Sequence, residues 1–157
     1  MIRDARDDDG PGIIALIDAC WSEYPGCLMD LDNEVPELRA LATYYAARGG
    51  RVWVAESERA IVGTVGIAPL ADGPWEVGKM YVTAGQRGTG LAQGLLDGAE
   101  AYAVGRGARE IRLWTDARFE RAHRFYEKRG YGGTGETREL HDISNSVEYA
   151  YSKSFSA

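Results

Sequence analysis

Residues 76–96 constrain the fold more than any other stretch of this chain. Apolar strand residues end near Val82, a loop with several glycines follows, and apolar residues then recur at helical spacing. The helix must therefore begin near Thr89 or Gly90, with its first backbone N–H groups directed into the loop. Because these N–H groups and the positive end of the helix dipole favour an anion, the stretch predicts a phosphate-binding loop.

Three loop residues support this prediction. Gly88 and Gly90 lack a Cβ, so the backbone can adopt positive φ there and approach a ligand closely. Arg87 adds a positive charge at the same place. The pattern is neither Gly-x-Gly-x-x-Gly nor a Walker loop, because no Gly-Lys-Ser/Thr follows. The loop alone therefore indicates an anion site and does not identify the ligand.

The composition predicts one soluble domain over residues 1–157, with 45% hydrophobic and 27% charged residues. The net charge of −6 argues against a nucleic-acid partner and would suit a cationic substrate. The sequence contains no apolar run long enough for a signal peptide or a membrane span, so we expect no membrane association and a cytoplasmic location. Cys20 and Cys27 have no partners at a familiar metal-ligand spacing, and no metal site is expected.

Hydrophobic periodicity predicts the order of the elements. Strand patterns cover 1–5, 52–55, 60–67, 75–82, 110–115 and 146–155, with one more strand from Tyr131, and helical patterns cover 13–21, 38–46, 91–105 and 116–129. The strand–helix–strand unit from 75 to 115 is a crossover, so its two strands should be parallel neighbours. The acidic segment 26–36 has no clean period and is predicted as a loop, which either walls a substrate pocket or is simply solvated.

A second distinctive stretch runs from Ala122 to Tyr131 and reads Ala-His-Arg-Phe-Tyr-Glu-Lys-Arg-Gly-Tyr. Together with Arg87-x-x-Gly90-x-Ala92, it is similar to the two signatures of the GCN5-related N-acetyltransferase (GNAT) family, in the right order. The resemblance covers essentially the whole chain. One departure is Phe119, where many relatives carry an asparagine that makes a polar contact to the cofactor.

The resemblance implies an α/β fold with a mixed, mostly antiparallel sheet and helices on both faces. Its central parallel pair, 75–82 and 110–115, would splay to admit acetyl-CoA. The strand end would offer backbone groups to the pantetheine arm and the thioester carbonyl, and the loop would hold the pyrophosphate. The cofactor contacts implied in this way are Met80, Tyr81, Val82, Arg87, Gly88, Thr89, Gly90, Leu91, Ala92, Phe119, Ala122 and Tyr126.

Tyr126 is the candidate general acid. A thiolate that leaves a thioester benefits from a proton donor, and a tyrosine with an ordinary pKa of about 10 still carries its proton at pH 7. The family often uses a tyrosine at this position in that role. The alternative is that Tyr126 only packs beside Phe119 and Ala122, which lie on the same helix face.

Glu76 is the leading candidate for the base that deprotonates the amine. It precedes the loop on the same strand and, if no bulge intervenes, shares a face with Met80 and Val82. The alternative is an exposed strand glutamate, which is a poor base without burial. Weaker candidates are Glu100, His123, His141 and Asp142.

These observations lead us to expect an acetyl-CoA-dependent N-acetyltransferase that transfers the acetyl group directly to a primary amine of a small molecule. Two alternatives stay open, namely an enzyme that acetylates protein lysines or N-termini and a non-catalytic acyl-CoA-binding module. Acetyl-CoA would be the co-substrate, and a homodimer stays open as the assembly.

Overall fold

The chain forms a seven-stranded sheet in the computed structural model, which describes residues 1–156. The strand order is β1-β2-β3-β4-β5-β7-β6, and every neighbouring pair is antiparallel except β4 and β5. The strands are β1 Ile2–Asp4, β2 Arg51–Ser57, β3 Ala60–Pro69, β4 Trp75–Val82, β5 Glu110–Asp116, β6 Gly132–Glu139 and β7 Val147–Ser154. The mixed α/β fold with one parallel pair is therefore confirmed.

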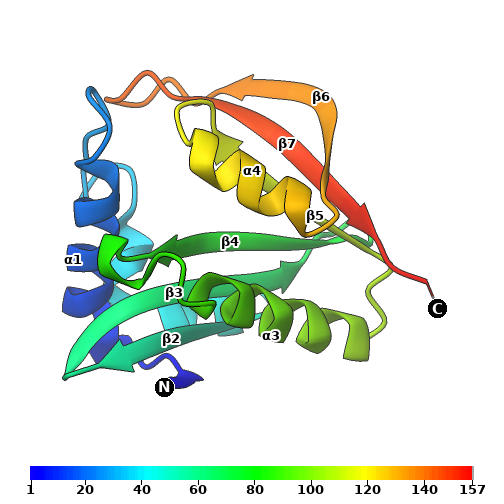
Figure 1. Cartoon of the computed structure of the whole chain (residues 1–157), viewed down its shortest axis with the longest axis horizontal. Helices are drawn as coiled ribbons and strands as arrows, with labels where there is room; N and C mark the ends of the chain where they lie inside the picture. The colour runs from blue at the N-terminus through cyan, green and yellow to red at the C-terminus, as the bar shows by residue number, and fades with distance from the viewer. Residues whose placement is uncertain (157) are drawn as a thin grey trace.

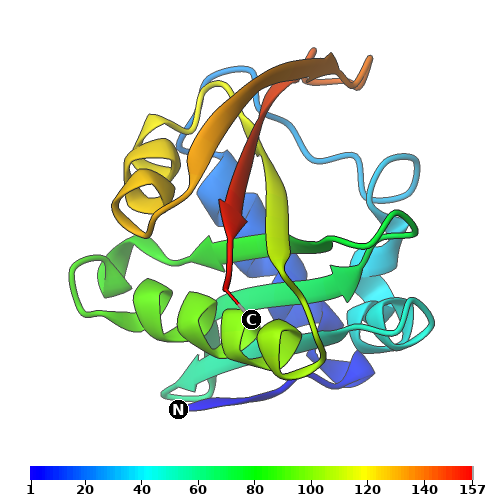
Figure 2. The same cartoon turned by 90° about the vertical axis from the view of Figure 1, so that its right-hand side faces the viewer.

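Helices cover both faces of this sheet (Figures 1 and 2). They are α1 Gly10–Trp21, α2 Leu41–Ala46, α3 Leu91–Gly105 and α4 Glu120–Lys128, with short 3-10 turns η1 Asp7–Asp9, η2 Pro36–Ala40 and η3 Ala84–Gln86. Apolar residues of α3 and α4 form one core with the sheet, and those of α1 and α2 form a second core on the opposite face. No helix within residues 1–156 is both long and apolar enough to cross a membrane.

The parallel pair opens soon after it begins. Register partners join β4 and β5 only at Trp75 with Ile111 and at Glu76 with Arg112, although β4 continues to Val82. Figure 2 shows the two strands diverging, with β4 across the molecule and β5 rising away from it. The β4 edge from Val77 to Val82 therefore has no strand partner on the β5 side, and its backbone groups remain available to a ligand.

The predicted order of elements is confirmed, and two helices differ at their ends. The helix predicted over 116–129 begins at Glu120, because the Asp116 carboxylate accepts a hydrogen bond from the Arg118 N–H at 2.8 Å and turns the chain first. The helix predicted over 38–46 divides into η2 and α2.

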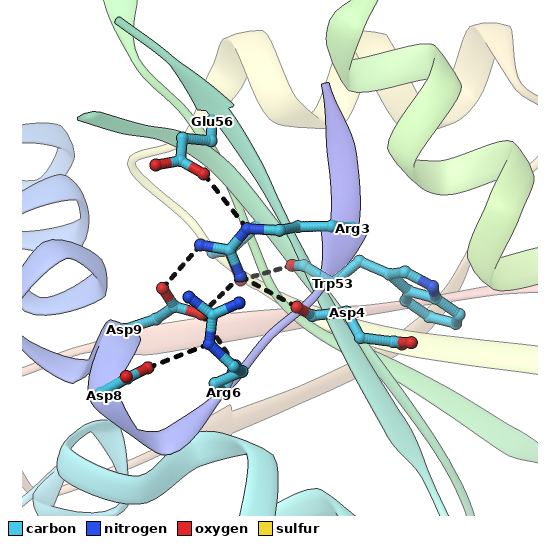
Figure 3. Close-up of polar contacts among 8 residues, drawn as sticks. Arg3, Asp4, Arg6, Asp8, Asp9, Trp53 and Glu56 are labelled. Carbon is cyan, nitrogen blue, oxygen red and sulfur yellow. Dashed lines mark hydrogen bonds and ion pairs between the residues drawn. The ribbon is translucent and has the colours of Figure 1, made fainter. Parts of the chain in front are cut away.

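An ion-pair network ties the edge strand β1 to the α1 layer (Figure 3). Arg3 donates to both carboxylate oxygens of Asp9, at 2.8 and 2.9 Å, and to Glu56 of β2 at 3.2 Å. Asp9 also accepts the backbone N–H of Arg6 at 2.7 Å and is only 8% exposed. The network therefore fixes the start of α1 against the sheet.

Candidate active site

The predicted phosphate-binding loop lies between β4 and α3. The turn η3 is followed by Gly88 at φ 78° and Gly90 at φ 85°, and Gly90 is the N-cap residue of α3. A Cβ added at either glycine would meet no atom within 4 Å, so the backbone angle and not space requires glycine there. The positive φ values predicted for both residues are confirmed.

A cavity of about 560 Å³ adjoins this loop, which is a volume typical of ligand sites. It is walled by the end of β4, the loop, the first turn of α3, one face of α4 and the end of α1. Its lining residues are Cys20, Tyr24, Met80, Tyr81, Val82, Gln86, Arg87, Gly88, Gly90, Ala92, Gln93, Phe119, Arg121, Ala122, Phe125, Tyr126 and Arg129.

Most of the residues implied as cofactor contacts lie on this wall, and two do not. The Thr89 hydroxyl is turned back to the carbonyl of Gln86, at 2.7 Å, and Leu91 packs into the core beneath α3. No sequence pattern indicated Cys20 and Tyr24, which reach the cavity from the last turn of α1 and the segment after it. Tyr24 packs against Phe119 with ring centroids 4.8 Å apart, so an aromatic contact stands where relatives carry asparagine.

The cavity wall carries three arginines and one nearby carboxylate. Arg87 donates to the two oxygens of Glu23 at 2.6 and 2.7 Å, and Arg121 lies 3.8 Å from Glu23. Arg129 instead donates to the side-chain oxygen of Gln93 at 3.0 Å. Guanidinium groups beside the N-terminus of a helix form an environment suited to phosphate.

Tyr126 lies where the large cavity meets a smaller one. It is 6% exposed, and burial raises the pKa of its hydroxyl, so the phenol keeps its proton. Within residues 1–156 the hydroxyl has no hydrogen-bond partner, and the residue lines both cavities. A protonated and unengaged hydroxyl on this mostly buried side chain could donate to a ligand in either cavity.

The smaller cavity, of about 70 Å³, opens between β4 and β5. Its wall is formed by residues of β4 and α4, including Lys79 of β4, together with Trp114, Thr115, Asp116 and Glu148. The Glu148 carboxylate pairs with Arg138 at 2.7 Å. The cavity therefore has acidic groups on its wall that the sequence did not indicate, because β5 and β7 supply them from different parts of the chain.

The shared face predicted for Glu76, Met80 and Val82 is wrong, because a bulge intervenes. Lys79 has φ 51°, and the register with β3 shifts between Thr64 and Gly66. Residues before and after the bulge therefore swap sides. Trp75, Val77, Met80 and Val82 pack toward α3 and α4, whereas Gly78 faces Tyr45 on the opposite side.

Glu76 consequently faces the α2 side of the sheet and lines neither cavity. Burial raises the pKa of its carboxyl, nearby Arg138 lowers it and Glu148 raises it further. Its carboxylate has no ion-pair partner among the described residues. A raised pKa suits a base, while the position requires a water between Glu76 and an amine in the smaller cavity.

The weaker base candidates make structural contacts outside both cavities. Glu100 accepts the hydroxyl of Tyr131 at 2.7 Å, and His123 contacts the carbonyl of Asp116 at 2.9 Å. Asp142 accepts the N–H of Ser146 at 2.7 Å, and His141 is 82% exposed. In the part of the chain that the structure describes, no group of three or more histidine, cysteine or acidic residues is placed to hold a metal ion.

Comparison with known proteins gives consistent matches. Residues 13–131 match the family described as the acetyltransferase (GNAT) family. N-acetyltransferase YjgM of Escherichia coli K12 is 35% identical over 136 residues, which cover 83% of this chain and 81% of that protein. N-acetyltransferase 8 of Rattus norvegicus is 33% identical over 100 residues, which cover 60% of this chain and 45% of that protein. The chain thus spans about half the length of that mammalian relative.

Solved structures share the fold. An acetyltransferase of Streptococcus agalactiae superposes with a TM-score of 0.84 at 20% identity, covering 99% of this chain and 98% of that one. An aminoglycoside 6′-N-acetyltransferase solved with coenzyme A superposes with a TM-score of 0.69 at 18% identity, covering 98% and 96%. On the family match and the E. coli relative, the chain belongs to the GNAT family of acetyltransferases.

Proposed function

We propose that this protein transfers the acetyl group of acetyl-CoA directly to a primary amine of a small molecule. The observation that supports this most strongly is the cavity whose wall extends from the glycine loop at the α3 N-terminus to Tyr126. It offers phosphate-binding groups at one end and a proton donor at the other. The coenzyme A bound by the aminoglycoside acetyltransferase of the same fold supports acetyl-CoA as the ligand.

Residues of β4 would position the thioester. Because β4 and β5 separate after Glu76, the backbone of Met80 to Val82 can pair with the amides of the pantetheine arm. The bulge takes Lys79 and Met80 out of the ladder with β3, and a β4 backbone N–H directed at the thioester carbonyl would stabilise the developing oxyanion.

The amine would approach through the smaller cavity, since that cavity also reaches Tyr126 and is walled by β5 as well as β4. Freeing a lysine-like amine, with pKa about 10.4, from its proton at pH 7 costs roughly 4–5 kcal/mol. We propose that a water molecule held by Glu76 removes this proton and passes it to the Glu76 carboxylate. Tyr126 then protonates the departing thiolate as the new amide bond forms and the thioester bond breaks.

The carboxylates of Asp116 and Glu148 on the smaller cavity, which pair with Arg118 and Arg138, could accept hydrogen bonds from a cationic acceptor, and the cavity's size suits a small one. A second copy of the chain as partner and a cytoplasmic location remain predictions from the sequence. Acetylation of a protein amine remains the alternative, and it would require an acceptor chain to reach Tyr126 through the same opening.

Two measurements test the proposal together. Acetyl-CoA should raise the melting temperature, and a library of small amines should contain acceptors that release free CoA thiol only when the protein is present. A melting temperature that does not change when acetyl-CoA is added would overturn the cofactor assignment. Binding without turnover on small amines, but with turnover on peptides, would replace the small acceptor with a protein one. Binding with no turnover on either would favour the non-catalytic acyl-CoA-binding module.

A further inference from the structure

The three arginines of the large cavity differ in their partners. Glu23 compensates the charges of Arg87 and Arg121, at 2.6 and 3.8 Å. Arg129 has no carboxylate within ion-pair distance among residues 1–156, and its hydrogen-bond partner there is the neutral Gln93. Arg129 therefore presents an uncompensated positive charge on the cavity wall.

One edge of the Arg129 guanidinium is only half used. Its Nη2 donates to Gln93, whereas its Nε is buried and is the one buried side-chain nitrogen or oxygen in residues 1–156 without a hydrogen-bond partner. An unpaired buried donor on a charged group is costly and calls for an explanation such as a missing ligand. The Nε and Nη2 atoms form the edge that binds a phosphate through two parallel hydrogen bonds.

The Arg129 edge and the Arg87 side chain lie on different parts of the cavity wall. Arg129 follows the last residue of α4 and reaches across to Gln93 on the first turn of α3, whereas the side chain of Arg87 turns to Glu23 beyond α1. The cavity thus holds two distinct groups of positive charge. Coenzyme A likewise carries two distinct phosphate groups, the diphosphate and the 3′-phosphate of its ribose.

We propose that Arg129 binds the 3′-phosphate of coenzyme A. The diphosphate would occupy the loop amides, and the 3′-phosphate would take the place of the Gln93 oxygen and engage Nε and Nη2 together. This assignment rests on the proposed function, because it requires a CoA thioester in the large cavity. It makes Arg129 the residue that distinguishes CoA from analogues without the 3′-phosphate.

The test compares CoA with 3′-dephospho-CoA by isothermal titration calorimetry on wild type and Arg129→Met. Methionine keeps aliphatic packing against Phe125, over which the guanidinium lies at 5.2 Å. Wild type should bind CoA about ten-fold or more tightly than 3′-dephospho-CoA. The variant should lose this preference, with CoA affinity falling to the level of 3′-dephospho-CoA and the latter affinity unchanged.

Arg124→Met is the matched control, since it removes the same charge from an exposed position on α4, the helix that Arg129 caps. It should leave the preference for CoA intact. The 3′-phosphate assignment would be overturned if Arg129→Met lowered the affinity for both ligands equally, or if wild type bound both with equal affinity. Either result would leave the proposed function standing. Failure of wild type to bind either ligand would instead overturn the proposed function itself.

Discussion

Tyr126 and Tyr81 both line the two cavities, and burial raises the pKa of both hydroxyls, but the Tyr81 hydroxyl accepts a hydrogen bond from Trp21 whereas that of Tyr126 is unengaged within residues 1–156. We predict that Tyr126→Phe lowers kcat by about 100-fold or more, the usual contribution of a general acid. The dissociation constant of acetyl-CoA should change little, since the ring and its packing remain. Steady-state kinetics and calorimetry measure the two effects.

Tyr131→Phe is the control for this substitution. Tyr131 is also a buried tyrosine, but its hydroxyl donates to Glu100 and lines neither cavity. Removing it should lower stability slightly and leave kcat unchanged. A Tyr126→Phe enzyme with wild-type kcat would return Tyr126 to a packing role.

Glu76 gives a prediction about pH. If Glu76 deprotonates the amine through water, Glu76→Gln should reduce the rate most between the raised pKa of Glu76 and the pKa of the amine, where the carboxylate is ionised and little free amine exists. The deficit should shrink as pH rises toward the amine pKa of about 10.4. The pH profile of kcat/KM for both proteins measures this, with exposed Glu139→Gln as control. A deficit that is constant across pH would argue against a base.

Glu23 competes with a ligand for two of the cavity arginines. Glu23→Gln should therefore tighten CoA binding several-fold at low salt, because Arg87 and Arg121 are released, and the gain should fade at high salt. Asp18→Asn makes the same charge change at an exposed site on α1. If the two variants bind CoA equally well, general charge and not the Glu23 contact sets the affinity.

The loop and α3 act as one element, and its prediction concerns backbone shape. Ala at position 90 must adopt φ near 85° at a cost of about 1–2 kcal/mol or shift the N–H groups that begin α3. Gly90→Ala should therefore lower the affinity for CoA about ten-fold or more, as measured by calorimetry. Gly85→Ala, where φ is not positive and nothing crowds a Cβ, should bind as wild type. Equal binding by both variants would contradict an amide cradle.

Elements with a local cause were predictable from the sequence, including the strands, the helices and the two glycines with positive φ. The β4 bulge could not be predicted from the sequence, because Lys79 is not a glycine and its positive φ follows from the register between β3 and β4. That single residue decides which way Glu76 faces. Likewise, Tyr24 and Glu148 reach the cavities through long-range packing that no local pattern records.

For the whole molecule, the Arg3–Asp9 network predicts how stability depends on pH. The hydrogen bonds from Arg3 hold the pKa of Asp9 below its ordinary value, despite an opposing effect of burial. A lowered folded-state pKa stabilises the protein above the unfolded value of about 3.9, and that contribution is lost as pH falls through the folded pKa. Asp9→Asn should therefore cost about 1.5–3 kcal/mol near pH 7.

Urea unfolding of wild type and Asp9→Asn between pH 2 and 7 measures this contribution. The two free energies of unfolding should differ at neutral pH and converge in acid, whereas Asp8→Asn, at a 78% exposed side chain, should follow wild type throughout. A difference that persists at pH 2 would assign the loss to packing and not to charge. Because this transition lies far below the pH range of amine chemistry, it leaves the pH profile of Glu76→Gln free of unfolding.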